Sequence, residues 1–275
     1  MASQTNILPR SYRKLFRPNG IVLGDAREYI PGDDVRFINW NITAKTGIPF
    51  VDSVKSDSGY DIIFALDISA SMKFGTQRQS KFSLASNILG SLSRLAEMHG
   101  DRAGLVLFSG GVEKFLKPRR NVKIFKYAIE KSVSTGKKSQ TNLASTLKIL
   151  SRILRNRSVI ILICDVFCLA TNRKATLAQL HTLREKHDVI LLAVIDDGEM
   201  PHARAGKVLL EDLETGETLW INTDDMALMS KIMDKYASYQ KLIFEDIRSL
   251  GVKISQANTR DSLEKSIFTF LNNLL

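Results

Sequence analysis

The sequence predicts an α/β protein built on a doubly wound, mostly parallel sheet of six strands. Two segments, residues 62–66 and 158–164, are apolar runs of strand length that end next to aspartates, as in strands covered by helices on both faces. From residue 61 onward, strand patterns alternate with amphipathic helical patterns, which is the order expected for parallel strands joined by crossover helices. The 275 residues, 44% of them hydrophobic, suffice for one large core and a small appendage.

After the first strand, helical and strand patterns follow one another to the end of the chain. We expect helices at residues 80–98, after Asn121, from Asn142, and at 171–186, 224–250 and 262–274, and strands at 103–108, 158–164, 189–195 and 252–256, with 113–116 as a possible antiparallel edge. If the strand order is 3-2-1-4-5-6, the strands that lead to Asp67 and Asp165 are neighbours where the order reverses. Doubly wound sheets bind ligands at that point, outside the carboxyl ends of the strands.

Two regions depart from the alternation and suggest a small β-rich appendage. Residues 1–59 contain no long helical pattern, and residues 205–222 have the pattern of a β-hairpin inserted into the main domain, which would span residues 60–275. We hypothesise that the hairpin pairs with the N-terminal segment. Trp40 and Trp220 are then expected to pack where the two regions join.

Five oxygen-bearing side chains follow the predicted strands in an order that suits a hard cation. Asp67, Ser69 and Ser71 come directly after the first strand, Thr141 precedes a helix, and Asp165 ends a later strand. Carboxylate and hydroxyl oxygens are suitable ligands for Mg²⁺ or Mn²⁺, and no soft ligand is needed. The same serines on a strand-to-helix turn also suit a helix N-cap, which is the purely structural interpretation.

The order of these motifs resembles the metal-ion-dependent adhesion site of von Willebrand factor A domains. The resemblance implies a von Willebrand factor A-like fold in which Ser69 and Ser71 ligate Mg²⁺ (or Mn²⁺), with Thr141 joining when a partner is bound. Asp67 and Asp165 would supply negative charge, partly through bridging waters, because Mg²⁺ dehydrates reluctantly. The remaining coordination position would accept a carboxylate of a partner protein.

The net charge of +10 is spread unevenly along the chain. Residues 1–20 carry four Lys/Arg and no acid, and residues 114–138 carry nine Lys/Arg against one acid, Glu130. Such a field favours an acidic partner, and we take Arg119, Arg120 and Lys123 as candidate contacts. The basic segments have no zinc-finger spacing, aromatic RNA-binding signature or helix-turn-helix pattern, so a solvated basic face is preferred over nucleic-acid binding.

Other sequence features bear on compartment and on nucleotide chemistry. No apolar run approaches the ~20 residues of a membrane-spanning helix, and the N-terminus lacks a segment of signal-peptide type, so we expect a cytoplasmic protein. The two cysteines, Cys164 and Cys168, give no disulfide framework. Residues 135–139, T-G-K-K-S, look like half of a phosphate loop but lack its first glycine and a preceding strand, so no intrinsic ATP hydrolysis is expected.

A longer resemblance covers nearly the whole chain. The block R-E-Y-I-P-G-D-D-V-R-F-I-N-W-N-I-T-A-K-T-G (residues 27–47) is similar to the signature of the domain-of-unknown-function-58 family, and the similarity continues at residues 100–109, 141–143, 164–167, 187–190 and 213–220. Members of that family carry a von Willebrand factor A-like domain and are typically encoded beside MoxR-type AAA+ ATPases. The resemblance implies a chaperone-like role with such an ATPase in assembling or activating other complexes.

These observations favour a non-enzymatic, metal-dependent protein-binding module. A metal-dependent hydrolase is the alternative from another class, in which the same ion activates water. Against it, no histidine or spare carboxylate lies near the metal motifs in sequence to act as a general base. A basic nucleic-acid-binding protein is a third alternative and rests on charge alone.

Overall fold

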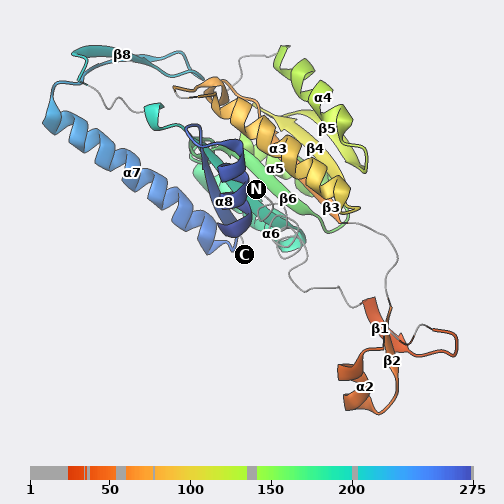
Figure 1. Cartoon of the computed structure of the whole chain (residues 1–275). Helices are drawn as coiled ribbons and strands as arrows, with labels where there is room; N and C mark the ends of the chain where they lie inside the picture. Colours follow the sequence, from red (N-terminus) through yellow and green to blue (C-terminus); the bar gives the residue numbers. More distant parts are fainter. Residues whose placement is uncertain are drawn as a thin grey trace. The chain divides into compact units, whose positions relative to one another are not determined.

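The computed structural model describes residues 24–33, 35, 38–53, 60–76, 78–134, 141–199 and 204–273. The chain divides into two compact units, residues 1–59 and residues 60–275. The larger unit contains the helices and strands around which the candidate site is built (Figure 1).

The smaller unit contains two strands and one short helix. Strands β1 (Gly24–Glu28) and β2 (Phe50–Ser53) pair in antiparallel fashion, and helix α2 (Trp40–Thr46) lies between them in sequence. Asn39 caps α2 by accepting a backbone N–H at 3.0 Å. Gly47 ends the helix at φ 73°, in the left-handed region that favours glycine.

The larger unit is built on one six-stranded sheet in the order β10-β7-β6-β3-β4-β5. Only β5, at the edge, is antiparallel to its neighbour. Numbered along the chain, this order is 3-2-1-4-5-6 read from β5, so the predicted fold class and strand order are confirmed. The strands are β3 (Asp61–Asp67), β4 (Arg102–Phe108), β5 (Val112–Arg119), β6 (Val159–Asp165), β7 (Asp188–Ile195) and β10 (Lys253–Asn258).

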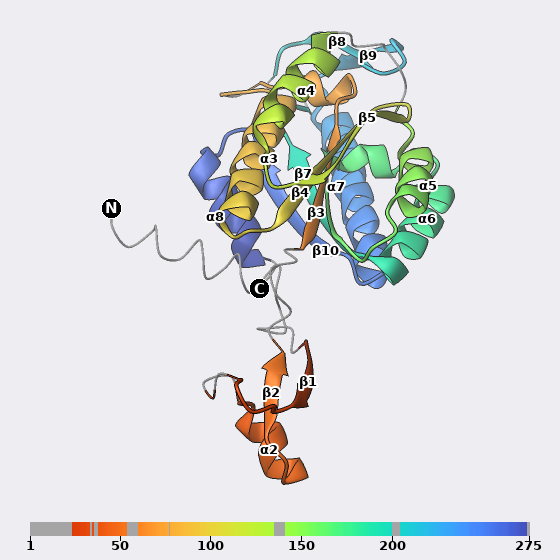
Figure 2. The same ribbon diagram turned by 90° about the vertical axis from the view of Figure 1, so that its right-hand side faces the viewer.

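Helices cover both faces of this sheet (Figure 2). One face carries α3 (Lys81–Met98), α4 (Lys123–Ser134) and α8 (Leu263–Asn273), and the other carries α5 (Leu143–Ile153), α6 (Arg173–Lys186) and α7 (Met226–Ser249). Every residue of β6 is buried, as are residues 62–67 of β3, which explains their apolar runs. Among the helices described, none combines the length and apolar character needed to cross a membrane.

The hairpin and the N-terminal strands each form a two-stranded sheet, and the expectation that they pair with one another stays a prediction. Strands β8 (Lys207–Glu211) and β9 (Thr218–Asn222) pair with each other, as β1 and β2 do. Trp40 is 69% exposed and Trp220 is 66% exposed, and their expected packing where the two regions join stays a prediction. Trp220 lies opposite Leu209, which is exposed as well, so the β8–β9 hairpin presents an apolar pair of side chains to solvent.

Loops after β3, β6 and β7 meet at the carboxyl edge of the sheet. Each of these strands leads into an aspartate and then a short 3₁₀ turn: η2 (Ser71–Lys73), η3 (Val166–Leu169) and η4 (Asp197–Glu199). Asp196, in the loop after β7, accepts a hydrogen bond from Thr76 Oγ1 at 2.5 Å, in the loop after β3. It also accepts one from Thr259 Oγ1 at 2.5 Å, in the loop after β10. These donors, together with two backbone N–H groups, outweigh the effect of burial and lower the pKa of Asp196.

We expect Gly198→Ala to destabilise the protein by about 1–3 kcal/mol, because a Cβ there would lie 2.1 Å from Thr76 Oγ1 and push the loop off Asp196. Gly90→Ala is the matched control, since it lies inside α3 with no atom within 4 Å of the added Cβ. That substitution should stabilise the protein by roughly 0.5–1 kcal/mol. Urea unfolding measures both, and similar shifts for the two variants would contradict the close approach.

Candidate metal centre

Asp67 ends β3 as a fully buried carboxylate. Its Oδ1 accepts the backbone N–H of Ser69 at 2.8 Å, whereas its Oδ2 has no hydrogen-bond partner among the residues that the structure describes. Burial, together with the nearby carboxylates of Asp165 and Glu214, outweighs the Ser69 hydrogen bonds and raises the pKa of Asp67 to about 7. A buried carboxylate oxygen of this kind is a strong candidate for contact with a cation.

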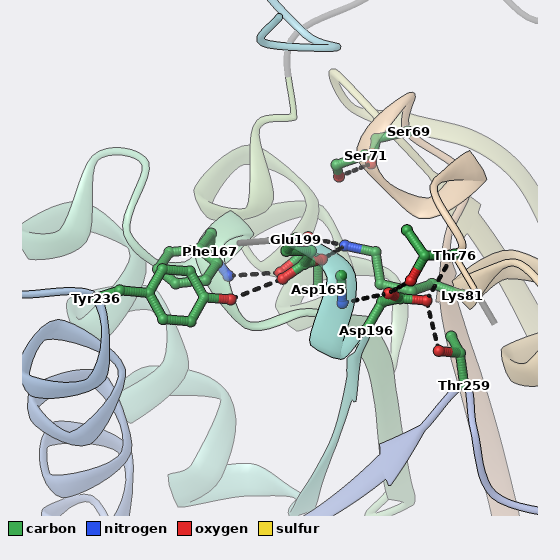
Figure 3. Close-up of polar contacts among 11 residues, drawn as sticks. Ser69, Ser71, Thr76, Lys81, Asp165, Phe167, Asp196, Glu199, Tyr236 and Thr259 are labelled. Carbon is green, nitrogen blue, oxygen red and sulfur yellow. Dashed lines mark hydrogen bonds and ion pairs between the residues drawn. The ribbon is translucent and has the colours of Figure 1, made fainter. Parts of the chain in front are cut away.

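The hydroxyls of Ser69 and Ser71 hydrogen-bond to each other, with their oxygens 3.0 Å apart (Figure 3). Adjacent ligands of an octahedral ion bound at about 2.1 Å are themselves separated by about 3 Å, so the two oxygens fit one Mg²⁺. The structural alternative, a helix N-cap, does not account for them. Ser80 caps α3 by accepting the Ser83 N–H at 3.2 Å, and η2 has no side-chain cap.

Thr141 lies just before α5. Its side chain hydrogen-bonds to an acidic residue that is distant in sequence and that sequence analysis did not predict as its partner. The Thr141 hydroxyl donates to Glu214 Oε1 at 2.5 Å, and the Thr141 backbone N–H donates to Glu214 Oε2 at 3.1 Å. Glu214 comes from the turn of the β8–β9 hairpin, 73 residues further along the chain. The family-like block at residues 213–220 contains this glutamate, but nothing in the block pointed to its partner.

Asp165 ends β6, and both of its oxygens accept hydrogen bonds. Oδ1 accepts the Phe167 N–H at 2.9 Å, and Oδ2 accepts from the ammonium of Lys81 at 2.5 Å. Lys81 also pairs with Glu199, whose Oε2 accepts from the Tyr236 hydroxyl at 2.7 Å (Figure 3). Asp165 therefore differs from Asp67, since a lysine already compensates its charge.

Lys81 is the most informative residue that sequence reasoning missed. It is the first residue of α3 and only 1% exposed. Burial alone would lower its pKa, but the carboxylates of Asp165 and Glu199 outweigh burial and raise the pKa of Lys81. A signal was present, because Lys81 precedes Leu84 and Ala85 by three and four residues on the buried stripe of the helix. A charge on such a stripe indicates a buried ion pair.

The described carboxylates of the site outnumber its cations. Asp67, Asp165, Glu199 and Glu214 carry four negative charges when ionised, and the ammonium of Lys81 carries one positive charge, which leaves a net charge of −3. A divalent cation would reduce this to −1. Over the described ranges no three Asp, Glu, His or Cys side chains converge closely enough to bind an ion by themselves. An ion here would need the hydroxyl oxygens as well.

The predicted basic contacts lie at the other edge of the sheet. All three are exposed: Arg119, Arg120 and Lys123. Arg119 pairs with Ala103 near the amino end of β4, whereas Phe108, at the carboxyl end of β4, pairs with Asp67. The basic residues and the candidate metal centre are therefore two separate surfaces.

The described histidines also lie away from the candidate metal centre. His99 follows α3, and His187 follows α6 directly before β7, so both are near the amino edge of the sheet. His181 is on the exposed side of α6. His202 lies outside the described residues.

Comparisons with known proteins give a family and a fold. Residues 25–241 match the model of a family described as "Protein of unknown function DUF58". An uncharacterized protein of Mycobacterium tuberculosis is 27% identical over 240 residues, which cover 86% of this chain and 74% of the relative.

Two solved structures share the fold. The conserved hypothetical protein BatB from Bacteroides thetaiotaomicron is 18% identical with a TM-score of 0.50, over 78% of this chain and 98% of BatB. An aerotolerance-related membrane protein from Bacteroides fragilis is 17% identical with a TM-score of 0.53, over 78% of this chain and 99% of that protein. The sheet has the doubly wound strand order that the sequence predicts.

The two aspartates should respond oppositely to neutralisation. In chelator, Asp67→Asn should stabilise the protein by about 1–3 kcal/mol, because it removes a buried, uncompensated charge while an amide oxygen can still accept the Ser69 N–H. Asp165→Asn should destabilise it by roughly 3 kcal/mol, because Lys81 loses a buried partner. Denaturant unfolding in EDTA measures both, and equal destabilisation would refute the difference between the sites.

Proposed function

The chain belongs to the DUF58 family, and from this premise we propose that it is a metal-dependent protein-binding module without enzymatic activity. The observation that carries the proposal is the buried Asp67 Oδ2, which has no hydrogen-bond partner in the described part of the chain, together with two serine hydroxyls whose spacing suits one Mg²⁺ or Mn²⁺. The excess of carboxylates over cations around it adds to the attraction for an ion.

Each predicted ligand has a distinct part in this proposal. Ser69 and Ser71 would contact the ion directly, and Asp67 would supply its negative charge. Asp165 would act through water, because both of its oxygens already accept hydrogen bonds. Thr141 would join when a partner is bound. When present, the ion supplies a hard, positively charged centre that attracts a further carboxylate.

The partner that fits this chemistry is a protein with an exposed Asp or Glu. Family membership makes a MoxR-type AAA+ ATPase, or a client of that ATPase, our proposed partner. In this scheme the chain couples the ATPase to other complexes in a chaperone-like manner, and any nucleotide dependence enters through the ATPase. The position of the described histidines, away from the carboxyl edge, favours binding over hydrolysis.

Isothermal calorimetry tests the ion directly. We expect Mg²⁺ and Mn²⁺ to bind the wild type and not Asp67→Ala. Mg²⁺ at 100 times its Kd should stabilise the wild type by about 2.7 kcal/mol. Ser93→Ala is the control, since Ser93 is a buried serine of α3 that donates to the backbone of Gly90. Equal heats of Mg²⁺ binding for wild type and Asp67→Ala would contradict the assignment of Asp67 to the metal site.

Co-purification with a MoxR-type ATPase tests the partner. Binding should require Mg²⁺ and Asp67, and it should survive reversal of charge at Arg119 and Arg120, because these lie at the opposite edge of the sheet. It should also persist at moderate salt, which weakens contacts between exposed charges. Loss of binding only in the charge-reversal variant would show that the basic face makes the contact.

A further inference from the structure

The hairpin turn brings a carboxylate, that of Glu214, to Thr141, one of the residues in the candidate metal centre. Both Glu214 oxygens bond to Thr141, one to its hydroxyl at 2.5 Å and one to its backbone N–H at 3.1 Å. Thr141 is the residue we propose to join the ion when a partner carboxylate binds. The Glu214 carboxylate therefore already contacts a residue that, in the proposed function, lies beside the carboxylate of the partner.

The hairpin turn is built to present this one side chain. Asp212 Oδ1 accepts the backbone N–H of Glu214 at 2.8 Å and that of Thr215 at 3.0 Å, and Gly216 closes the turn at φ 76°. Within residues 211–220, all of which the structure describes, Glu214 alone is not exposed. Among the described contacts, the Glu214 carboxylate, and not apolar packing, thus attaches the turn to the rest of the larger unit.

A second observation points to a cation beside Glu214. Asp67 is fully buried, its Oδ2 has no hydrogen-bond partner over the described ranges, and Glu214 is close enough to act on it electrostatically. Lys81 is bonded to the other two acids of the site, Asp165 and Glu199. The carboxylates of Asp67 and Glu214 repel each other, and a cation bound near both would relieve that repulsion.

We propose that the β8–β9 hairpin is a built-in competitor in which Glu214 takes the position of the partner's carboxylate beside the metal ion. This inference rests on the proposed function. In the free protein Glu214 then occupies this position. A partner binds only after a carboxylate of the partner has displaced Glu214. Because the turn is held through one side chain, release requires little other rearrangement of the hairpin turn.

Paramagnetic broadening by Mn²⁺ tests the position of Glu214. In the full chain, sub-stoichiometric Mn²⁺ should broaden the amide signals of Ser69 and Ser71 and also those of Thr215 and Gly216. Glu214→Ala should lose the broadening at the turn and keep it at the serines. Glu214→Gln serves as a second variant that preserves side-chain size, and Glu217→Ala, an exposed acid of the same hairpin, should behave like the wild type.

Acetate, as a small carboxylate probe, tests the competition. With protein in excess over Mn²⁺, relaxation of the acetate methyl protons should increase in both Glu214 variants relative to wild type and Glu217→Ala. Broadening at the serines with none at the turn, or equal acetate relaxation in all four proteins, would overturn the competitor and leave the metal centre standing. No broadening at either place would overturn the proposed function, and the competitor with it.

Discussion

Unequal compensation of two buried aspartates at adjacent strand ends governs the chemistry of this site. The parallel pairing of β3 with β6 brings Asp67 and Asp165 to one edge of the sheet. Lys81 compensates Asp165, while Asp67 keeps an oxygen without a partner. Burying a charge is costly unless it is paired. Asp67 is consequently the residue whose environment an added cation would change most.

The loops around this edge are tied to one another by polar contacts. Asp196 connects the loop after β3 to the loop after β10 through Thr76 and Thr259. Lys81 likewise joins the ends of β6 and β7 by bonding to Asp165 and Glu199. These contacts hold Asp165 and the loops after β3 and β7 in place before any ion arrives, which lowers the cost of ordering them on binding.

The larger unit also separates its surfaces. The candidate metal centre and the turn of the β8–β9 hairpin share the carboxyl edge. The exposed Arg119 and Arg120, at the end of β5, lie at the amino edge. An acidic partner could therefore use either surface without covering the other. The exposed Leu209–Trp220 pair gives the hairpin an apolar face distinct from its carboxylate.

Much of the fold and part of the site follow from sequence alone. Continuous apolar runs, helical periodicity and caps such as Asn142 are local properties, and they determined the elements and their alternation. Handed crossovers then placed Asp67 beside Asp165. The pairings of Lys81 with Asp165 and of Thr141 with Glu214 join residues 84 and 73 positions apart. Only the tertiary structure decided these contacts, and with them which acid lacks a partner, because no local pattern encodes which buried charges meet.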